Sequence, residues 1–153
     1  MTTRREWLQT TGALALALPA GLAGIRLSAA DDNDIEVWKS PTCGCCTLWV
    51  NHMRTNGFRP NTHDVADVAP IKRKYGVPAT LESCHTAIVG GYALEGHVPA
   101  DLVRQVLKTR PAIAGLAVPG MPMGSPGMEG PRKDKYDVIA FDKQGKTRVF
   151  ASR

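Results

Sequence analysis

The chain has 153 residues, 22% of them charged, and its formal net charge is +5 at pH 7. This length allows an export signal and one domain with a hydrophobic core, but it leaves little room for a second domain. The basic residues are scattered and form no stripe with interleaved aromatic residues, so the composition argues against a nucleic-acid-binding protein.

The chain begins with features that are typical of an export signal. Arg4-Arg5 resembles the start of a twin-arginine motif, a mildly apolar stretch follows over residues 12–25, and Ser28-Ala29-Ala30 provides small residues for cleavage. We therefore expect a twin-arginine signal peptide over residues 1–30, cleaved near Ala30, and a single mature domain over residues 31–153 in the periplasm. The protein would then meet the membrane only through the export machinery. An uncleaved membrane anchor is the alternative, but the apolar stretch is short and contains glycine.

The first part of the mature chain has the pattern of a strand, a helix, a strand and a second helix. Four apolar residues recur at helical spacing after the first strand: Cys46, Trp49, Val50 and Met53. The expected elements are a strand over residues 35–39, a helix over residues 45–56 that ends at Gly57, an extended segment over residues 58–64 and a short helix over residues 68–75.

The second part begins with an extended run over residues 83–89. Gly90-Gly91 then has the form of a two-residue hairpin turn, which a returning strand over residues 92–94 should follow. A helix is expected over residues 99–108, because proline suits the first turn of a helix. Residues 115–130 are so rich in glycine and proline that we expect neither helix nor strand there.

A terminal hairpin should pair residues 136–141 with residues 147–150. The order of the preceding elements, strand–helix–strand and then strand–strand–helix with a short helix between, is that of a thioredoxin-like domain. The sequence therefore predicts an α/β fold with a small mixed sheet and flanking helices. To this core it adds a loop rich in glycine, proline and methionine, and a C-terminal β-hairpin.

Three of the four cysteines lie together in Cys43-Gly44-Cys45-Cys46, between the first expected strand and the first expected helix. Cys43 and Cys46 have the CxxC spacing of a thioredoxin-type redox turn, and the start of a helix favours thiolates. Gly44 would allow a tight turn with positive φ that directs the neighbouring sulfur atoms inward. Two structural disulfides are disfavoured, because the adjacent Cys45 and Cys46 pair poorly with one another and cannot both pair with Cys43.

A thiolate is both a nucleophile and a soft metal ligand, so the cysteines allow two functions. One is a thiol–disulfide oxidoreductase in which Cys43 attacks and Cys46 resolves. The other is a copper site, because Cu(I) prefers sulfur ligands and bridging thiolates can hold more than one ion. Cys84 would supply the fourth sulfur from a distant loop. Zinc is disfavoured, since it usually takes two separated CxxC pairs.

Histidines and methionines extend the set of candidate ligands. His85 follows Cys84 and is a candidate nitrogen ligand if this segment is a loop, since neighbouring residues on a strand point to opposite faces. His97 either approaches the same edge of the sheet or caps the following helix. Met121 and Met123 are candidate thioether ligands, with packing of their loop against the core as the alternative.

Two further histidines are not expected to bind the same metal. His52 lies beyond Cys45 by a helical rise of roughly 10 Å, which is too far for a shared ion. We expect His52 to lie at the surface or to contribute to packing. His63 is expected in a loop.

Several short motifs occur together in one order, and their combination resembles the periplasmic copper-resistance CopG family. (The ribbon-helix-helix repressor of the same name is unrelated.) The resemblance covers residues 35–129. The motifs are Cys43-Gly44-Cys45-Cys46, Ser83-Cys84-His85-Thr86-Ala87, Gly91-Tyr92, Glu95-Gly96-His97-Val98-Pro99 and Pro119-Gly120-Met121-Pro122.

The resemblance implies a thioredoxin-like fold and a multinuclear Cu(I) centre. Residue by residue, the cluster cysteines fall on Cys43, Cys45, Cys46 and Cys84. The implied role is copper resistance or homeostasis, with copper ions as the bound species and other periplasmic copper-handling or efflux proteins as partners. If copper redox cycling is coupled to cysteine oxidation, the protein is a copper-dependent oxidoreductase.

Overall fold

The computed structural model describes residues 32–153. The signal peptide expected over residues 1–30 and its cleavage site lie outside the described residues. The strands are β1 (Asp34–Lys39), β2 (Arg59–Asp64), β3 (His85–Val89), β4 (Tyr92–Gly96), β5 (Gly115–Val118), β6 (Asp137–Phe141) and β7 (Thr147–Ser152). The helices are α1 (Gly44–Thr55), α2 (Ala69–Lys74), α3 (Ala100–Thr109) and a 3-10 turn, η1 (Ala79–Leu81). Within the described part of the chain, no helix is both long and apolar enough to cross a bilayer.

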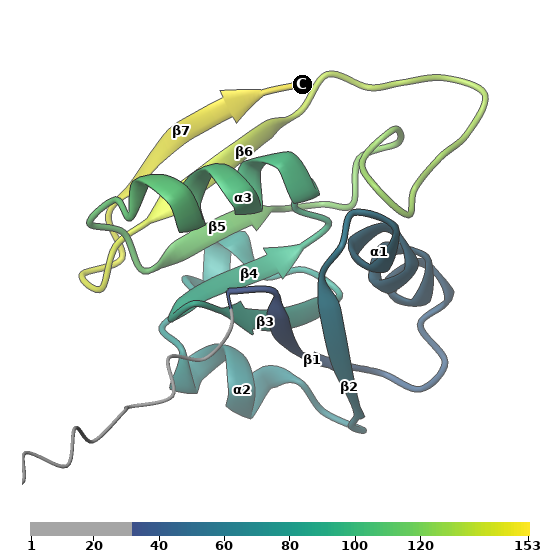
Figure 1. Ribbon diagram of the computed structural model, residues 1–153, viewed down its shortest axis with the longest axis horizontal. Coiled ribbons are helices and arrows are strands. Elements are labelled where there is room, and N and C mark those ends of the chain that lie inside the picture. The colour runs from purple at the N-terminus through teal and green to yellow at the C-terminus, as the bar shows by residue number, and fades with distance from the viewer. Residues whose placement is uncertain (1–31) are drawn as a thin grey trace, which may run out of the picture.

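The strands form a single mixed sheet in the order β2-β1-β3-β4-β5-β6-β7 (Figure 1). β1 is parallel to β2 and antiparallel to β3, and β3 is antiparallel to β4. This half of the sheet has the strand–helix–strand and strand–strand–helix units that the sequence predicts for a thioredoxin-like domain. β4, α3 and β5 then form a parallel crossover, and β6 and β7 form the predicted terminal hairpin.

Helices cover both faces of this sheet. α1 and α3 pack on one face, where Trp49, Met53 and Leu102 belong to the main cluster of buried apolar side chains. The segment of α2 and η1 covers the other face through a smaller cluster that includes Leu81 and Phe141. Successive residues of a strand therefore contribute to opposite layers, as the twofold alternation of a pleated strand requires.

The segment after α3 is not irregular throughout, so the expectation for residues 115–130 is wrong at its start. Gly115–Val118 is strand β5, parallel to β4 and antiparallel to β6. Glycine is required at its first position, because a Cβ on Gly115 would lie 2.1 Å from the carbonyl oxygen of Ala93. The glycine that suggested a loop instead allows two backbones to approach closely.

Two smaller expectations also fail. Gly44 opens α1 and is not among the glycines with positive φ, so the cysteine turn does not depend on a left-handed glycine. His63 lies in strand β2 rather than in a loop. Its ring stacks on Trp38 at 5.1 Å between ring centroids, and its Nε2 lies 2.5 Å from a carboxylate oxygen of Glu36 on the neighbouring strand.

Candidate metal centre

The cysteine trio lies where β1 gives way to α1. Cys43 has extended φ and ψ values of −76° and 95° and precedes the first helical residue, and Cys46 is fully buried on the inner face of the helix. Cys43 and Cys46 form a disulfide in this structure, whereas Cys45 and Cys84 are free. The Cys45 sulfur lies 3.6 Å from that of Cys43. The helix start therefore gathers three sulfur atoms within one turn.

The fourth cysteine reaches the trio from the middle of the chain. Cys84 lies in the bend directly before β3, and β3 pairs with β1, the strand that leads into the trio. The sulfur atoms of Cys43, Cys45, Cys46 and Cys84 all lie within 4.8 Å of one another. The structure thus brings together all four sulfur atoms that the sequence nominates.

Two histidines lie beside the Cys84 sulfur. His85 Nδ1 lies 3.3 Å from this sulfur and His97 Nε2 lies 3.1 Å from it. Both residues are fully buried, and their rings stack on each other at 5.4 Å between centroids. The His85 ring also packs on Trp49 of α1. Cys84, His85 and His97 form a second group of potential ligands, and Cys84 is common to both groups.

The hairpin of β3 and β4 explains why His97 lies beside Cys84. The turn at Gly90-Gly91 pairs Val89 with Tyr92 and Thr86 with Glu95. Continued by two residues, this register sets Cys84 opposite His97. Of the two positions expected for His97, this register selects the edge of the sheet beside Cys84. His85 can join because Cys84 lies before the strand rather than in it.

Burial controls the protonation of these groups. It raises the pKa of the Cys84 thiol to about 12, and the nearby charge of Cys45 adds to the effect. Burial lowers the pKa of His97 to about 4, against an opposing effect of Glu129. It also lowers the pKa of His85 well below its ordinary value, helped by the charges of His97 and Lys72. At neutral pH the metal-free site therefore holds a protonated Cys84 thiol beside two neutral imidazoles.

This combination of donors fits copper. Thiolates suit Cu(I), and neutral imidazole suits copper in general. The outer ring nitrogens, His85 Nε2 and His97 Nδ1, are buried without a hydrogen-bond partner. No hydrogen bond therefore forces a proton onto the inner nitrogens that face Cys84, which remain available as ligands. The thiol must lose its proton before it can bind a metal.

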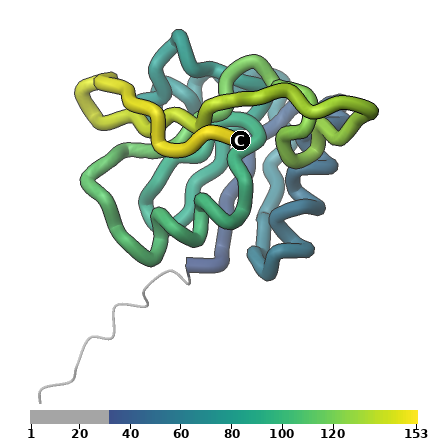
Figure 2. The backbone as a smooth tube through the Cα atoms, turned by 90° about the horizontal axis from the view of Figure 1, so that it is seen from above, coloured from purple at the N-terminus to yellow at the C-terminus, as the bar shows by residue number. Residues whose placement is uncertain are grey.

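The loop rich in glycine, proline and methionine that follows β5, residues 119–130, is called the methionine loop. It lies against the start of α1, as Figure 2 shows in a second view. A Cβ on Gly127 would lie 2.8 Å from the carbonyl oxygen of Cys45 and 2.7 Å from the backbone nitrogen of Trp49, so the loop backbone packs directly on this helix. Met121 is 40% exposed, with a left-handed φ of 48°. Met123 packs its sulfur over Gly130 within the loop. These positions favour the packing interpretation for Met123 and leave Met121 open to solvent.

His52 has a role in packing rather than in the cysteine group. Its Nε2 accepts a hydrogen bond from the backbone N–H of Ala100 at 3.2 Å, so it caps the start of α3. A cap of this helix is one of the two roles expected for His97, but the structure shows that His52 provides it. Burial lowers the pKa of His52, which keeps the acceptor nitrogen unprotonated.

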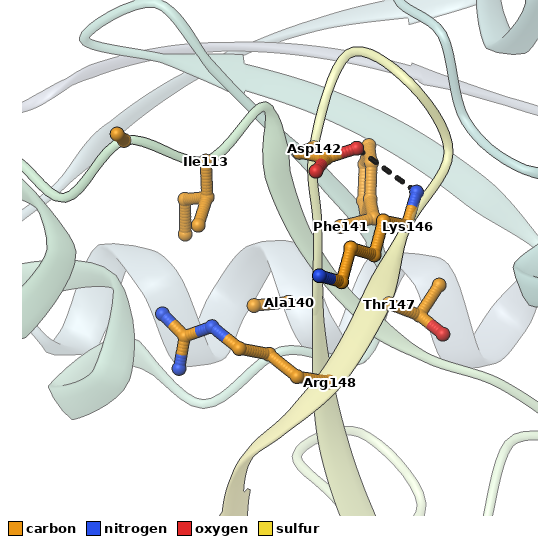
Figure 3. Close-up of a pocket in the computed structure, with 8 residues that line it drawn as sticks. Ile113, Ala140, Phe141, Asp142, Lys146, Thr147 and Arg148 are labelled. Atoms are coloured by element: carbon orange, nitrogen blue, oxygen red, sulfur yellow. Dashed lines mark hydrogen bonds between the residues drawn. The ribbon is translucent and has the colours of Figure 1, made fainter.

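A surface cavity of about 180 Å³ lies between the segment before β5 and the β6–β7 hairpin (Figure 3). Lys146 and Arg148 line it, and the backbone N–H of Lys146 donates to the carboxylate of Asp142 at 2.9 Å. None of the residues that line this cavity belongs to either ligand group. The candidate centre is therefore the cysteine and histidine group rather than this hollow.

The comparisons with known proteins point in the same direction. Residues 81–128 match a family described as a protein of unknown function, DUF411. Two solved structures, named copper resistance protein CopG form 2 and form 1, are each 42% identical to the chain, with TM-scores of 0.76 and 0.75. Each match covers 80% of this chain, and 99% and 98% of the respective structures. No curated protein matches the chain.

Proposed function

Because the chain belongs to the CopG family of copper resistance proteins, we propose that it is a periplasmic protein that binds Cu(I) through cysteine thiolates in copper resistance. The observation that carries this proposal is the convergence of four sulfur atoms within 4.8 Å. Such spacing allows thiolates to bridge neighbouring soft ions, so we propose a multinuclear site.

Each residue of the group has a distinct role in this proposal. Cys43, Cys45 and Cys46 offer three thiolates from one helical turn once the disulfide is reduced. Cys84 offers the sulfur that joins the trio to the histidines, and His85 and His97 offer neutral nitrogen ligands beside it. Met121 and Met123 remain candidate thioether ligands, although neither is needed to complete this set.

The redox state of the trio determines which ligands are available. With Cys43 and Cys46 joined, the free thiols are Cys45 and Cys84. Reduction of the disulfide by two electrons and two protons returns the two missing thiols. We propose that copper handling by this protein is coupled to that change: oxidation of two Cu(I) ions to Cu(II) would supply the two electrons and water the two protons, which is the sense in which it would act as a copper-dependent oxidoreductase.

The proposed location follows from the twin arginines at the start of the chain. Arg4-Arg5 and the small residues before position 31 support export of a folded protein to the periplasm. The copper-handling or efflux proteins of that compartment are the proposed partners. A twin-arginine route also allows the site to be loaded before export.

The substitution Cys45→Ser tests copper binding against simple dithiol chemistry. It leaves the CxxC pair, Cys84 and both histidines, so we expect the loss of one bound Cu(I) and roughly a tenfold weaker affinity, about 1.4 kcal/mol. The measurement is an anaerobic competition titration of the reduced protein against a coloured Cu(I) chelator. Leu48→Ser is the matched control, because Leu48 is 53% exposed on the same helix. Copper loading that Cys45→Ser leaves unchanged would contradict the proposed centre.

The disulfide itself favours a second candidate function, a thiol–disulfide oxidoreductase that uses Cys43 and Cys46. In that case the metal-free protein should exchange disulfides with oxidised glutathione. The exchange should survive both Cys45→Ser and Cys84→Ser. An absence of exchange in the metal-free, reduced protein would remove this candidate and leave copper binding.

A further inference from the structure

We propose that the buried carboxylate of Glu95 is a positioning residue for copper binding, because it holds the backbone at Ser83 and thereby places the Cys84 sulfur against the trio. This inference rests on the proposed function, since it assigns how one sulfur of that site is kept in place. The carboxylate itself is not proposed as a metal ligand.

The contacts of Glu95 carry the inference. One carboxylate oxygen, Oε1, accepts the backbone N–H of Ser83 at 2.5 Å and also contacts the Nζ of Lys72 on α2. The other oxygen, Oε2, accepts the hydroxyl of Thr86 on β3 at 2.7 Å. Glu95 and Thr86 are fully buried and Lys72 is 5% exposed. A single carboxylate therefore ties together α2, β3, β4 and the residue that precedes Cys84.

The Cys84 segment has no regular structure of its own to hold it. Residues 82–84 lie between η1 and β3, so the chain there depends on contacts with its neighbours. Ser83 rests directly on β4, because a Cβ on Gly96 would lie 2.5 Å from the Ser83 hydroxyl oxygen. The bond from the Ser83 amide to Glu95 fixes this segment immediately before the cysteine. The strand then places His85 towards Trp49.

A buried charged pair is a costly way to fold a sheet, and apolar residues of similar volume often serve as well. This pair, however, binds the amide of Ser83, the residue directly before Cys84. Because the Cys84 sulfur must lie close to three other sulfur atoms, this hydrogen bond gives the pair a role that apolar residues cannot fill. A carboxylate accepts a strong hydrogen bond from the loop, whereas a methyl group accepts none and a thioether sulfur only a weak one. Outer-shell partners of this kind usually change metal affinity by about 10–100-fold when they are removed.

The test compares variants that differ in whether they can accept from the Ser83 amide. Lys72→Met/Glu95→Met removes the acceptor without leaving a buried charge alone. Lys72→Met/Glu95→Gln keeps one carbonyl oxygen as acceptor, likewise without leaving a buried charge alone, and should rescue the position. Thr86→Val removes the partner of the second carboxylate oxygen and one acceptor of Lys72 Nζ, but it leaves the bond from the Ser83 amide in place, and so serves as a matched control. Circular dichroism confirms that each variant is folded.

The first measurement uses no copper. In a Cys43→Ser/Cys46→Ser background, the equilibrium of the Cys45–Cys84 disulfide with glutathione reports how close these two thiols are held. We expect Lys72→Met/Glu95→Met to lower this effective concentration at least about tenfold, with Lys72→Met/Glu95→Gln and Thr86→Val within about threefold of the parent. An unchanged value in the double methionine variant would overturn the proposal, and so would an equal fall in all three variants.

A second variant keeps the test decisive if the methionine pair does not fold. Ser83→Pro removes the amide hydrogen and leaves the buried Lys72–Glu95 pair in place. The preceding residue, Glu82, already has the extended φ and ψ of −57° and 139° that a following proline favours. We expect the same fall in effective concentration, and a parent-like value for a folded Ser83→Pro protein would overturn the proposal.

The second measurement adds Cu(I) to the reduced protein with all four cysteines. The Lys72→Met/Glu95→Met variant should bind Cu(I) about 10–100-fold more weakly than the parent. This difference should vanish when Cys84 is also replaced by serine. An equal loss with and without Cys84 would mean a general structural role and would overturn the proposal. If even the parent protein binds no copper, the proposed function fails, whereas the glutathione equilibrium still decides the role of Glu95.

Discussion

Replacing Cys84 by serine is expected to weaken Cu(I) binding by at least about 100-fold, or about 2.7 kcal/mol, and to lower the number of bound ions. Loss of an outer-shell partner alone costs about 10–100-fold, and loss of the sulfur that both ligand groups share should cost more, whereas Cys45 belongs to one group only. Cys84 is also the only residue shared by the two ligand groups among the described residues. Its removal leaves the trio and the histidines without a common sulfur.

Competition titration of the reduced, anaerobic protein measures this effect. Glu82→Ser is the control, because Glu82 is exposed in the same segment and its replacement introduces the same side chain two residues away. Thermal unfolding of both metal-free variants shows whether the fold is kept. A Cys84→Ser protein that binds Cu(I) as tightly as its parent would show that the trio alone forms the site.

Oxidation of the CxxC pair is expected to have an effect of similar size. In the disulfide form, two of the four sulfur atoms are joined to each other and cannot act as thiolates. Two thiols and two imidazoles remain, and the Cys84 thiol keeps a pKa raised to about 12 by burial. We therefore expect Cu(I) affinity to fall by at least about 100-fold on oxidation and to return fully on reduction.

The measurement titrates oxidised and reduced samples of the same protein with Cu(I) under anaerobic conditions. A Cys43→Ser/Cys46→Ser protein cannot form this disulfide, so it should bind weakly whatever the redox treatment. Free-thiol counting before each titration confirms the state of the sample. Equal affinity in the oxidised and reduced wild-type protein would separate copper binding from the redox state of the pair.

The amino-acid sequence predicts the outline of this fold because its strongest signals are local. Helical spacing of Cys46, Trp49 and Met53 identifies α1, and the glycine pair identifies the β3–β4 hairpin. The sequence does not predict β5, because Gly115 serves a tertiary contact with β4 on the other side of the α3 crossover. A glycine required by tertiary packing cannot be distinguished from a glycine in a loop by composition alone.

The same distinction applies to the candidate centre. The trio is visible in one short motif, whereas the proximity of Cys84 depends on the pairing of β3 with β1. The register of the hairpin, which continues to a position opposite Cys84, decides between the two positions expected for His97. The role of Glu95 could not be predicted, because it depends on three elements meeting at one carboxylate. The spacing of residues along the sequence does not show that these elements meet in the folded protein.

The most direct test is to count the ions held by the reduced protein. Native mass spectrometry during an anaerobic Cu(I) titration should show more than one Cu(I) per chain at saturation. Alkylation of the saturated complex should then leave all four cysteines unmodified. A chain that saturates with one ion, or that leaves Cys84 open to alkylation at saturation, would contradict a centre shared by the four sulfur atoms.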